Sequence, residues 1–195
     1  MAMLKKLVSA SLALATVFAL CSCDAKDLKI PKKIPEITEI TLSAEDVDYL
    51  NSKHQDTAVE VQKGLQDETS MINDVYKLVN EYRKSMDKEI VDFDTSLSVI
   101  ATIRAQEIAK SGKFSHHRPD NKGYFSTLYH EYGFTSGNAG ENLAKTYKTP
   151  EEAVQAWRES PSHNSCMLNS KWTKTGIGIA KTDDGGYIWV QEFSD

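Results

Sequence analysis

The sequence lacks several features that define large protein classes. Its apolar run from Leu7 to Leu20 is shorter than the roughly 20 residues that a membrane-crossing helix needs. There is no cluster of basic residues beyond short pairs such as Lys32-Lys33, and 28 acidic residues outnumber 23 basic ones, for a net charge of −5. Nucleic acid is therefore not an expected partner. No internal repeat is visible, so a repeat architecture is not expected either.

The overall composition is that of a folded globular protein. Hydrophobic residues make up 40% of the chain and charged residues 26%, which is enough apolar material to bury a real core. A length of 195 residues corresponds to one ordinary domain with additional segments.

The N-terminal residues have the pattern of a targeting segment. Lys5 and Lys6 precede the apolar run, as in a secretory signal peptide. The run ends in Leu-Cys-Ser-Cys, which resembles the bacterial lipobox, in which the last cysteine is acylated after cleavage. Residues 1–22 are therefore predicted to be a lipoprotein signal peptide and Cys23 the lipidated N-terminus. The alternative is an ordinary secretory signal, which would release the protein.

This prediction determines the expected location and the use of the cysteines. Lipid on Cys23 would attach the protein to the cell membrane or the outer cell surface, on the extracytoplasmic side, with the membrane as a partner. Cys21 would leave with the signal peptide. Cys166 would then be the one cysteine in the folded part, where no internal disulfide could form.

The rest of the chain divides near residue 69. Residues 23–68 are predicted to be the lipidated N-terminus and a tether, because residues 24–41 show no sustained period and contain two prolines. Residues 43–66 are polar with spaced apolar positions and could form a helix of unassigned role. Residues 69–195 are predicted to form the folded domain.

Within this domain, helical patterns come first and strand patterns last. Apolar residues recur at helical spacing in residues 72–82, 97–108, 121–132 and 151–157, and a short helix bearing His163 should begin at Pro161. The second of these helices should begin near Asp94 or Thr95 and end at Gly112, and Thr149 should cap the fourth. Residues 187–193 follow a turn of two aspartates and two glycines and should pair with residues 177–179 in a hairpin. The expected fold class is α+β, with helices packed on a mainly antiparallel sheet.

Four sequence blocks then resemble one family. They are Phe-Ser-His-His-Arg-Pro-Asp at 114–120, Gly-Glu-Asn-Leu-Ala at 140–144, Ala-Trp-Arg-Glu-Ser-Pro-Ser-His at 156–163 and Gly-Ile-Gly-Ile-Ala at 176–180. Their order and spacing are similar to those of the CAP superfamily, in its bacterial SCP-like branch. The resemblance implies a three-layer α-β-α sandwich with a cleft lined by two histidines and one or two acidic residues.

The resemblance also assigns individual positions. His116 matches the first cleft histidine, Glu141 the glutamate of the Gly-Glu-Asn motif, and His163 the second cleft histidine. The resemblance implies that these three are the candidate metal ligands. His117, next to His116, takes a variable position of the family and is a further candidate cleft residue.

A fourth acidic position departs from the family pattern. Many members have a second glutamate three residues after the helix tryptophan, where this chain has Ser160, with Glu159 one residue earlier. One residue of helix is a rotation of about 100°. Glu159 is therefore expected to point away from the cleft, although both residues remain candidate cleft positions.

The three matched residues are compatible with three chemistries. Two imidazoles and a carboxylate could bind zinc or another divalent metal with room for a water. They could also perform general acid and base catalysis without metal. A third reading is a buried polar network that braces the sandwich. The residues alone do not choose among these.

Two functions follow from these chemistries. The first is an extracytoplasmic binding module whose cleft takes a lipid, a glycan or a partner protein. The alternative is a secreted metal-dependent, protease-like hydrolase that uses the same cleft. The sequence shows neither a dedicated nucleophile nor an H-E-x-x-H helix, which favours the binding module. Whether the chain is an enzyme at all stays open at this point.

Overall fold

The computed structural model describes residues 32–53, 55–134 and 137–195. The predicted signal peptide and the predicted lipidation site Cys23 lie outside these residues. Within the described part of the chain, no helix is both long enough and apolar enough to span a bilayer. The elements are α1 (Ala44–Lys53), α2 (Gln55–Asp67), α3 (Thr69–Ser85), β1 (Asp92–Phe93), α4 (Thr95–Ser111), α5 (Ser126–Glu131), β2 (Ala139–Lys145), α6 (Pro150–Glu159), α7 (Pro161–Met167), β3 (Lys174–Lys181) and β4 (Tyr187–Ser194).

A single sheet with the strand order β1-β3-β4-β2 forms the middle of the fold. β4 pairs antiparallel with both β3 and β2, while the two-residue strand β1 pairs parallel with β3. The expected α+β class is confirmed, and the sheet is mixed because of β1. The predicted hairpin is the β3–β4 pair.

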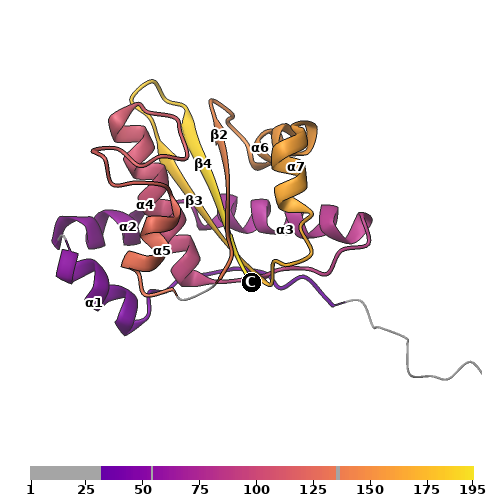
Figure 1. Cartoon of the computed structure of the whole chain (residues 1–195), viewed down its shortest axis with the longest axis horizontal. Helices are drawn as coiled ribbons and strands as arrows, with labels where there is room; N and C mark the ends of the chain where they lie inside the picture. Colours follow the sequence, from indigo (N-terminus) through magenta and orange to yellow (C-terminus); the bar gives the residue numbers. More distant parts are fainter. Residues whose placement is uncertain (1–31, 54, 135–136) are drawn as a thin grey trace, which may run out of the picture. The chain divides into compact units, whose positions relative to one another are not determined.

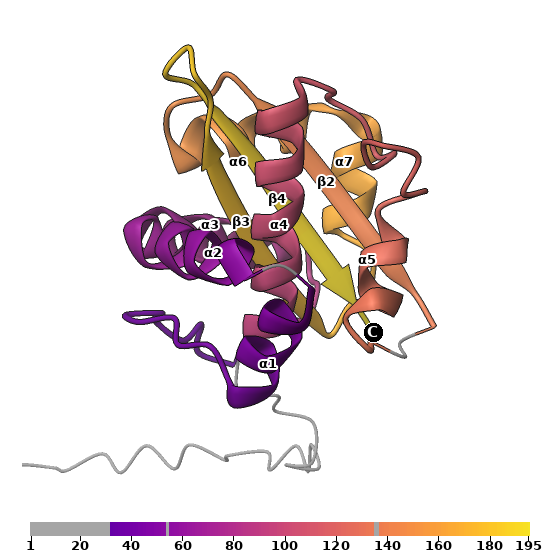
Figure 2. The same ribbon diagram turned by 90° about the vertical axis from the view of Figure 1, so that its left-hand side faces the viewer.

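Helices cover both faces of this sheet (Figure 1). α4 lies across β3 and β4 on one face, as Figure 2 shows, whereas α3, α6 and α7 pack on the other face. The three-layer sandwich implied by the family resemblance is therefore present.

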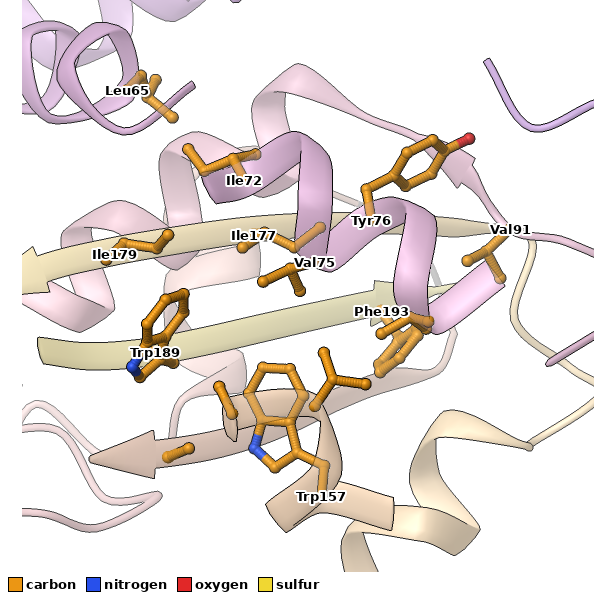
Figure 3. Close-up of a cluster of buried hydrophobic side chains, with 14 of the residues drawn as sticks. Leu65, Ile72, Val75, Tyr76, Val91, Trp157, Ile177, Ile179, Trp189 and Phe193 are labelled. Carbon is orange, nitrogen blue, oxygen red and sulfur yellow. The ribbon is translucent and has the colours of Figure 1, made fainter. Parts of the chain in front are cut away.

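The two faces bury different side chains. Alternation along β4 directs Trp189 and Phe193 toward α3 and α6, where they join Trp157 in the main hydrophobic core (Figure 3). Ile188 and Val190 point the other way, toward Ala101 and other small residues of α4.

Two glycines allow α4 to approach β3 closely. A Cβ atom built on Gly176 would lie 2.2 Å from the backbone carbon of Leu97, and one on Gly178 would lie 2.1 Å from that of Ala101. Such distances are impossible for real side chains, so both positions require glycine for this packing. The small residues in the block at 176–180 therefore determine the distance between helix and sheet.

Most predicted helix ends coincide with the observed ones. Asp94 accepts a hydrogen bond from the Leu97 amide at the start of α4, and Gly112 ends that helix at φ 68°. Thr149 caps α6 through the amide of Glu152.

The helix expected over residues 121–132 is wrong in its first half. Only Ser126–Glu131 are helical. Asp120 and Asn121 both have φ of 57°, which is the left-handed region and incompatible with a right-handed helix. His117 and Tyr124 instead form an isolated antiparallel bridge around this turn.

The segment before residue 69 packs on the domain rather than running past it. Its apolar positions Ile40, Leu50, Val61 and Leu65 are all at most 2% exposed and belong to the main core. The helix expected in residues 43–66 is present as α1 and α2. The boundary at 69 stays a prediction about what folds independently, and a chain starting at Glu68 tests it.

One buried acid fastens this segment. Asp46, 2% exposed, exchanges hydrogen bonds with Ser43 in a capping box at the start of α1. Its other oxygen accepts from the hydroxyls of Ser96 on α4 and Tyr132 after α5, each at 2.9 Å. The segment is thus tied to two elements of the domain.

Candidate functional site

The centre of the site is an ion pair between α4 and β2. Nε of Arg104 donates to Oε2 of Glu141 at 2.9 Å, and both side chains are fully buried. Nη2 of the same guanidinium donates to the backbone oxygen of Ser115, at the start of the motif loop. Arg104 therefore joins the helix, the strand and the loop that carries the first histidine.

His116 completes this arrangement. Its Nδ1 lies 2.8 Å from Oε1 of Glu141, while its side chain remains 40% exposed. Because the carboxylate accepts hydrogen bonds, Nδ1 is assigned as the protonated nitrogen, and Nε2 is then the ring nitrogen with a lone pair for a ligand. The short bond of Arg104 goes to Oε2 of Glu141, and Oε1 is shared by His116 and a longer contact from Nη2 of Arg104.

The local sequence explains how these side chains meet. Glu141 and Leu143 are two residues apart on β2, so both point toward α4. Arg104 follows Ala101 by three positions, on the helix face that the glycines of β3 bring close to the sheet. A larger helix-to-sheet distance would separate the guanidinium from the carboxylate.

His163 lies in the first turn of α7, as predicted, and is partly buried. Burial lowers the pKa of His163, and the charge that His116 can carry lowers it further. The amide of Asn142, next to Glu141, donates to the backbone oxygen of His163 and connects α7 to β2.

The other candidate cleft residues lie apart from this ion pair. His117 is exposed and packs edge-on against Tyr124, with ring centroids 5.3 Å apart. Glu159 is exposed and accepts a hydrogen bond from Gln155 on its own helix. The hydroxyl of Ser160 lies 3.3 Å from that of Ser162.

No group of three or more His, Cys, Asp or Glu side chains within residues 32–53, 55–134 and 137–195 has an arrangement that could hold a metal ion. The chemistry of the donor set gives a reason. Arg104 places a fixed positive charge on one oxygen of Glu141, and His116 occupies the other. Direct ligation by this carboxylate would require breaking a buried ion pair, which disfavours Glu141 as a metal ligand.

A cleft opens beside His116. Its volume is about 470 Å³, and its walls include His116, Glu141, Tyr124, Phe125 and Tyr129. A larger hollow of about 790 Å³ lies between α1, α2 and α4, and its walls contain none of the predicted site residues. The smaller cleft is therefore the candidate ligand site.

Sequence reasoning missed a second buried acid. Glu192 on β4 is the cross-strand partner of Glu141 and is completely buried. Oε2 of Glu192 accepts a hydrogen bond from the Tyr129 hydroxyl at 2.9 Å. Burial, followed by the nearby charge of Glu141, raises the pKa of Glu192 well above the ordinary value. The alternation of side chains along β4 could have identified it, because Glu192 lies on the same side of the strand as the inward-facing Ile188 and Val190.

Sequence reasoning also assigned no role to the arginines. Glu107 on α4 bridges Arg104 at 3.2 Å and Arg118 at 2.8 Å, and Arg118 also binds Glu131 on α5. This chain of ion pairs connects the cleft to the loop after α4. Arg118 belongs to the motif block at 114–120, so the block holds the loop in place as well as supplying His116.

Cys166 lies on α7, three residues after His163. Burial, followed by the nearby carboxyl groups of Glu192 and Glu141, raises the pKa of its thiol to about 12. At neutral pH the group is therefore a thiol and a poor nucleophile.

Comparisons with known proteins agree with this architecture. The sequence profile described as "CAP: Cysteine-rich secretory protein family" matches residues 76–193. Uncharacterized protein YkwD of Bacillus subtilis (strain 168) is 34% identical over 119 residues, which are 61% of this chain and 45% of that protein. Uncharacterized membrane protein YlbC of the same strain is 25% identical over 122 residues, which are 63% of this chain and 35% of that protein. The chain spans less than half the length of either relative.

Two solved structures share the fold. An outer surface protein from Borrelia burgdorferi is 23% identical, with a TM-score of 0.61 over 66% of this chain and 94% of that chain. An extracellular protein containing a SCP domain from Bacillus anthracis is 24% identical, with a TM-score of 0.60 over 68% of this chain and 42% of that chain. At these identities the similarity establishes the fold alone.

Proposed function

Since the chain belongs to the cysteine-rich secretory protein (CAP) family, we propose that it is an extracytoplasmic binding module, anchored to the cell envelope through lipid on Cys23, which takes its ligand in the His116 cleft. The observation that carries this proposal is the orientation of His116. Glu141 holds Nδ1 of the ring, so that Nε2 is available beside a cleft of about 470 Å³ with aromatic walls. A preoriented hydrogen-bonding group beside aromatic side chains in a cleft is typical of small-molecule sites.

The ligand classes remain those expected from the sequence: a lipid, a glycan or a partner protein. The extracytoplasmic location is supported by two fold relatives that are described as an outer surface protein and an extracellular protein. The lipid anchor rests on the Leu-Cys-Ser-Cys sequence alone.

A divalent metal such as zinc is part of the proposal, in a revised form. His116 and His163 would hold the ion, and Glu141 would act through His116 instead of as a direct ligand. Histidines that bind metals almost always donate their other ring N–H to a carboxylate, a backbone carbonyl or a water, and His116 has such a partner in Glu141. When bound, the ion would supply a Lewis acid that can attract an anionic or carbonyl oxygen of the ligand.

The hydrolase alternative has less support. Its chemistry would need a nucleophile or an activated water, and the thiol nearest to His163 is held in its protonated form. We therefore retain the binding module as the proposed function.

Zinc titration of the purified protein tests this function. Zinc should raise the melting temperature of the wild type at about pH 7.5 but hardly at about pH 5.5, because protonated imidazole cannot bind metal. The double variant His116→Ala/His163→Ala should lose the shift, and His117→Ala should retain it as the matched exposed control. An equal shift in the double variant would remove the metal from the proposal.

A separate experiment tests the anchor. The wild type should partition into the detergent phase and carry acyl chains on Cys23, whereas Cys23→Ser should be lost from membranes. Full partitioning of Cys23→Ser would contradict lipidation at this residue.

A further inference from the structure

Two glutamates share one buried position of the sheet. Glu141 on β2 and Glu192 on β4 are direct cross-strand partners, so their side chains leave the same face about 5 Å apart at Cβ. Both side chains are fully buried under α4. Two carboxylates in such a position cannot both be ionised unless each has a compensating charge.

Arg104 supplies one compensating charge, and it is hydrogen-bonded to Glu141. Arg104 donates to Glu141 through Nε at 2.9 Å and through Nη2 at 3.5 Å. The remaining titratable groups that face Glu192 are Tyr129 from α5 and Cys166 from α7. Neither carries a positive charge. The charge of Arg104 also acts to lower the pKa of Glu192, but its guanidinium donates to Glu141, and no cation among the described residues donates to Glu192.

The acceptor oxygens around Glu192 also outnumber the donor hydrogens that face them. The hydroxyl of Tyr129 has one hydrogen but faces two acceptors, Oε2 of Glu192 at 2.9 Å and the backbone oxygen of Phe193 at 3.1 Å. Oε1 of Glu192 finds no donor among the described residues. The Glu141 carboxyl leaves the same face of the neighbouring strand, directly opposite Glu192, and is therefore the acceptor that the strand register places beside it. Two acceptors at this separation form a bond only if one of them carries a hydrogen.

From this geometry we propose that Glu192 is a neutral carboxylic acid that donates a hydrogen bond to Glu141 and thereby positions that carboxylate against His116 and Arg104. Glu192 is a positioning residue, because it acts on the cleft through Glu141. The raised pKa of Glu192, caused first by burial and then by Glu141, is consistent with this state. The proposal rests on the proposed function only in that His116 and Glu141 serve the cleft.

Infrared spectroscopy of the metal-free protein tests the protonation state. A neutral carboxylic acid gives a carbonyl stretching band that is separate from the bands of carboxylates. At neutral pH, the wild type should show this band and Glu192→Gln should lose it. Glu81→Gln, which changes an exposed glutamate of α3, should retain it. If Glu192→Gln loses only carboxylate absorption, Glu192 is ionised and the proposal is overturned.

The positioning role needs a second readout. Imidazole ¹⁵N chemical shifts show which ring nitrogen of His116 is protonated and whether the ring has one environment. Glu192→Gln keeps a neutral donor of the same shape, so the His116 signals should match those of the wild type. Glu192→Leu removes the donor, and the His116 signals should shift or split.

The outcomes separate this proposal from the proposed function. Unchanged His116 signals in folded Glu192→Leu would overturn the positioning role, whatever the protein binds. If Glu192→Leu does not fold, the Glu192→Gln comparison still decides, since an ionised Glu192 replaced by a neutral amide would move the His116 signals. Loss of the zinc shift in His116→Ala/His163→Ala concerns the cleft alone and leaves the protonation result intact.

Discussion

The two faces of the sheet are packed with side chains of different size and polarity. The face toward α3, α6 and α7 is filled with large aromatic and aliphatic side chains such as Trp157, Trp189 and Phe193. The face toward α4 uses glycine and alanine, so that the helix backbone touches the strand, and it buries Arg104 and Glu141. One face therefore supplies mainly hydrophobic stability, and the other supplies fixed distances between charged groups.

This difference explains why the site lies where it does. A buried ion pair needs close and rigid geometry, because desolvation of its charges is otherwise not compensated. Large side chains would hold a helix farther from the sheet and would adjust their rotamers. Backbone contact between α4 and β3 leaves little such freedom.

The largest loss of stability is expected on the aromatic face. Trp157→Ala removes a fully buried indole from the main core and should lower the free energy of unfolding by about 4 kcal/mol. Chemical denaturation measures this loss. The His116 signals of the variant should stay unchanged under native conditions, and a change in them would mean that the two faces are not independent.

The next effect is expected on the α4 face. Gly178→Ala adds a methyl group that would lie 2.1 Å from a backbone carbon of Ala101, so α4 must move outward at a cost of about 3 kcal/mol. In contrast to Trp157→Ala, this variant should also displace Arg104 from Glu141 and alter the His116 signals. An unaltered site in folded Gly178→Ala would contradict the link between helix distance and site geometry.

The free energy of unfolding should depend on pH through Glu192, the buried acid of the α4 face. The folded pKa of Glu192 is raised above the ordinary 4.5, so in the window above that value the folded state holds a proton that the unfolded state has lost. The stability contributed by this group is therefore complete below pH 4.5 and declines as pH rises, by at most about 1.4 kcal/mol per pH unit. Wild type minus Glu192→Gln isolates the slope, and equal pH profiles would contradict it.

The smallest change in stability is expected for an exposed residue that packs on neither face of the sheet. Glu159→Gln changes an exposed carboxylate whose partner is Gln155 on the same helix, so stability should change by less than about 0.5 kcal/mol. Zinc binding should also be unchanged. A clear loss of zinc affinity would return Glu159 to the cleft and weaken the assignment of the site to the α4 side.

Local signals predicted much of the fold. The caps at Asp94 and Thr149, the glycine after α4 and the strand over 187–193 depend on neighbouring residues, which the sequence displays directly. The left-handed turn at Asp120 and Asn121 was missed because the helix was extended back to residue 121, although the apolar residues at helical spacing begin only at Phe125. Packing of Leu50 and Leu65 into the core was missed because it depends on contacts far along the chain.

The site was only partly predictable for the same reason. The family motifs identified His116, Glu141 and His163, but not which groups surround the carboxylate. Arg104 and Glu192 reach Glu141 through helix-to-sheet distance and strand register, neither of which a single sequence states. The expected role of Glu141 as a metal ligand stays a prediction, and the geometry favours its action through His116.

The glycines of β3 also restrict how this protein can diverge. Most steric conflicts in a core can be relieved by shrinking a neighbouring side chain, so one substitution permits another. At Gly176 and Gly178 the conflicting atoms include the backbone of α4, which every amino acid possesses. No substitution in the helix can remove them. A larger residue at either position would be accommodated only if the whole of α4 moved away from the sheet. Both glycines are therefore among the least replaceable residues of the chain.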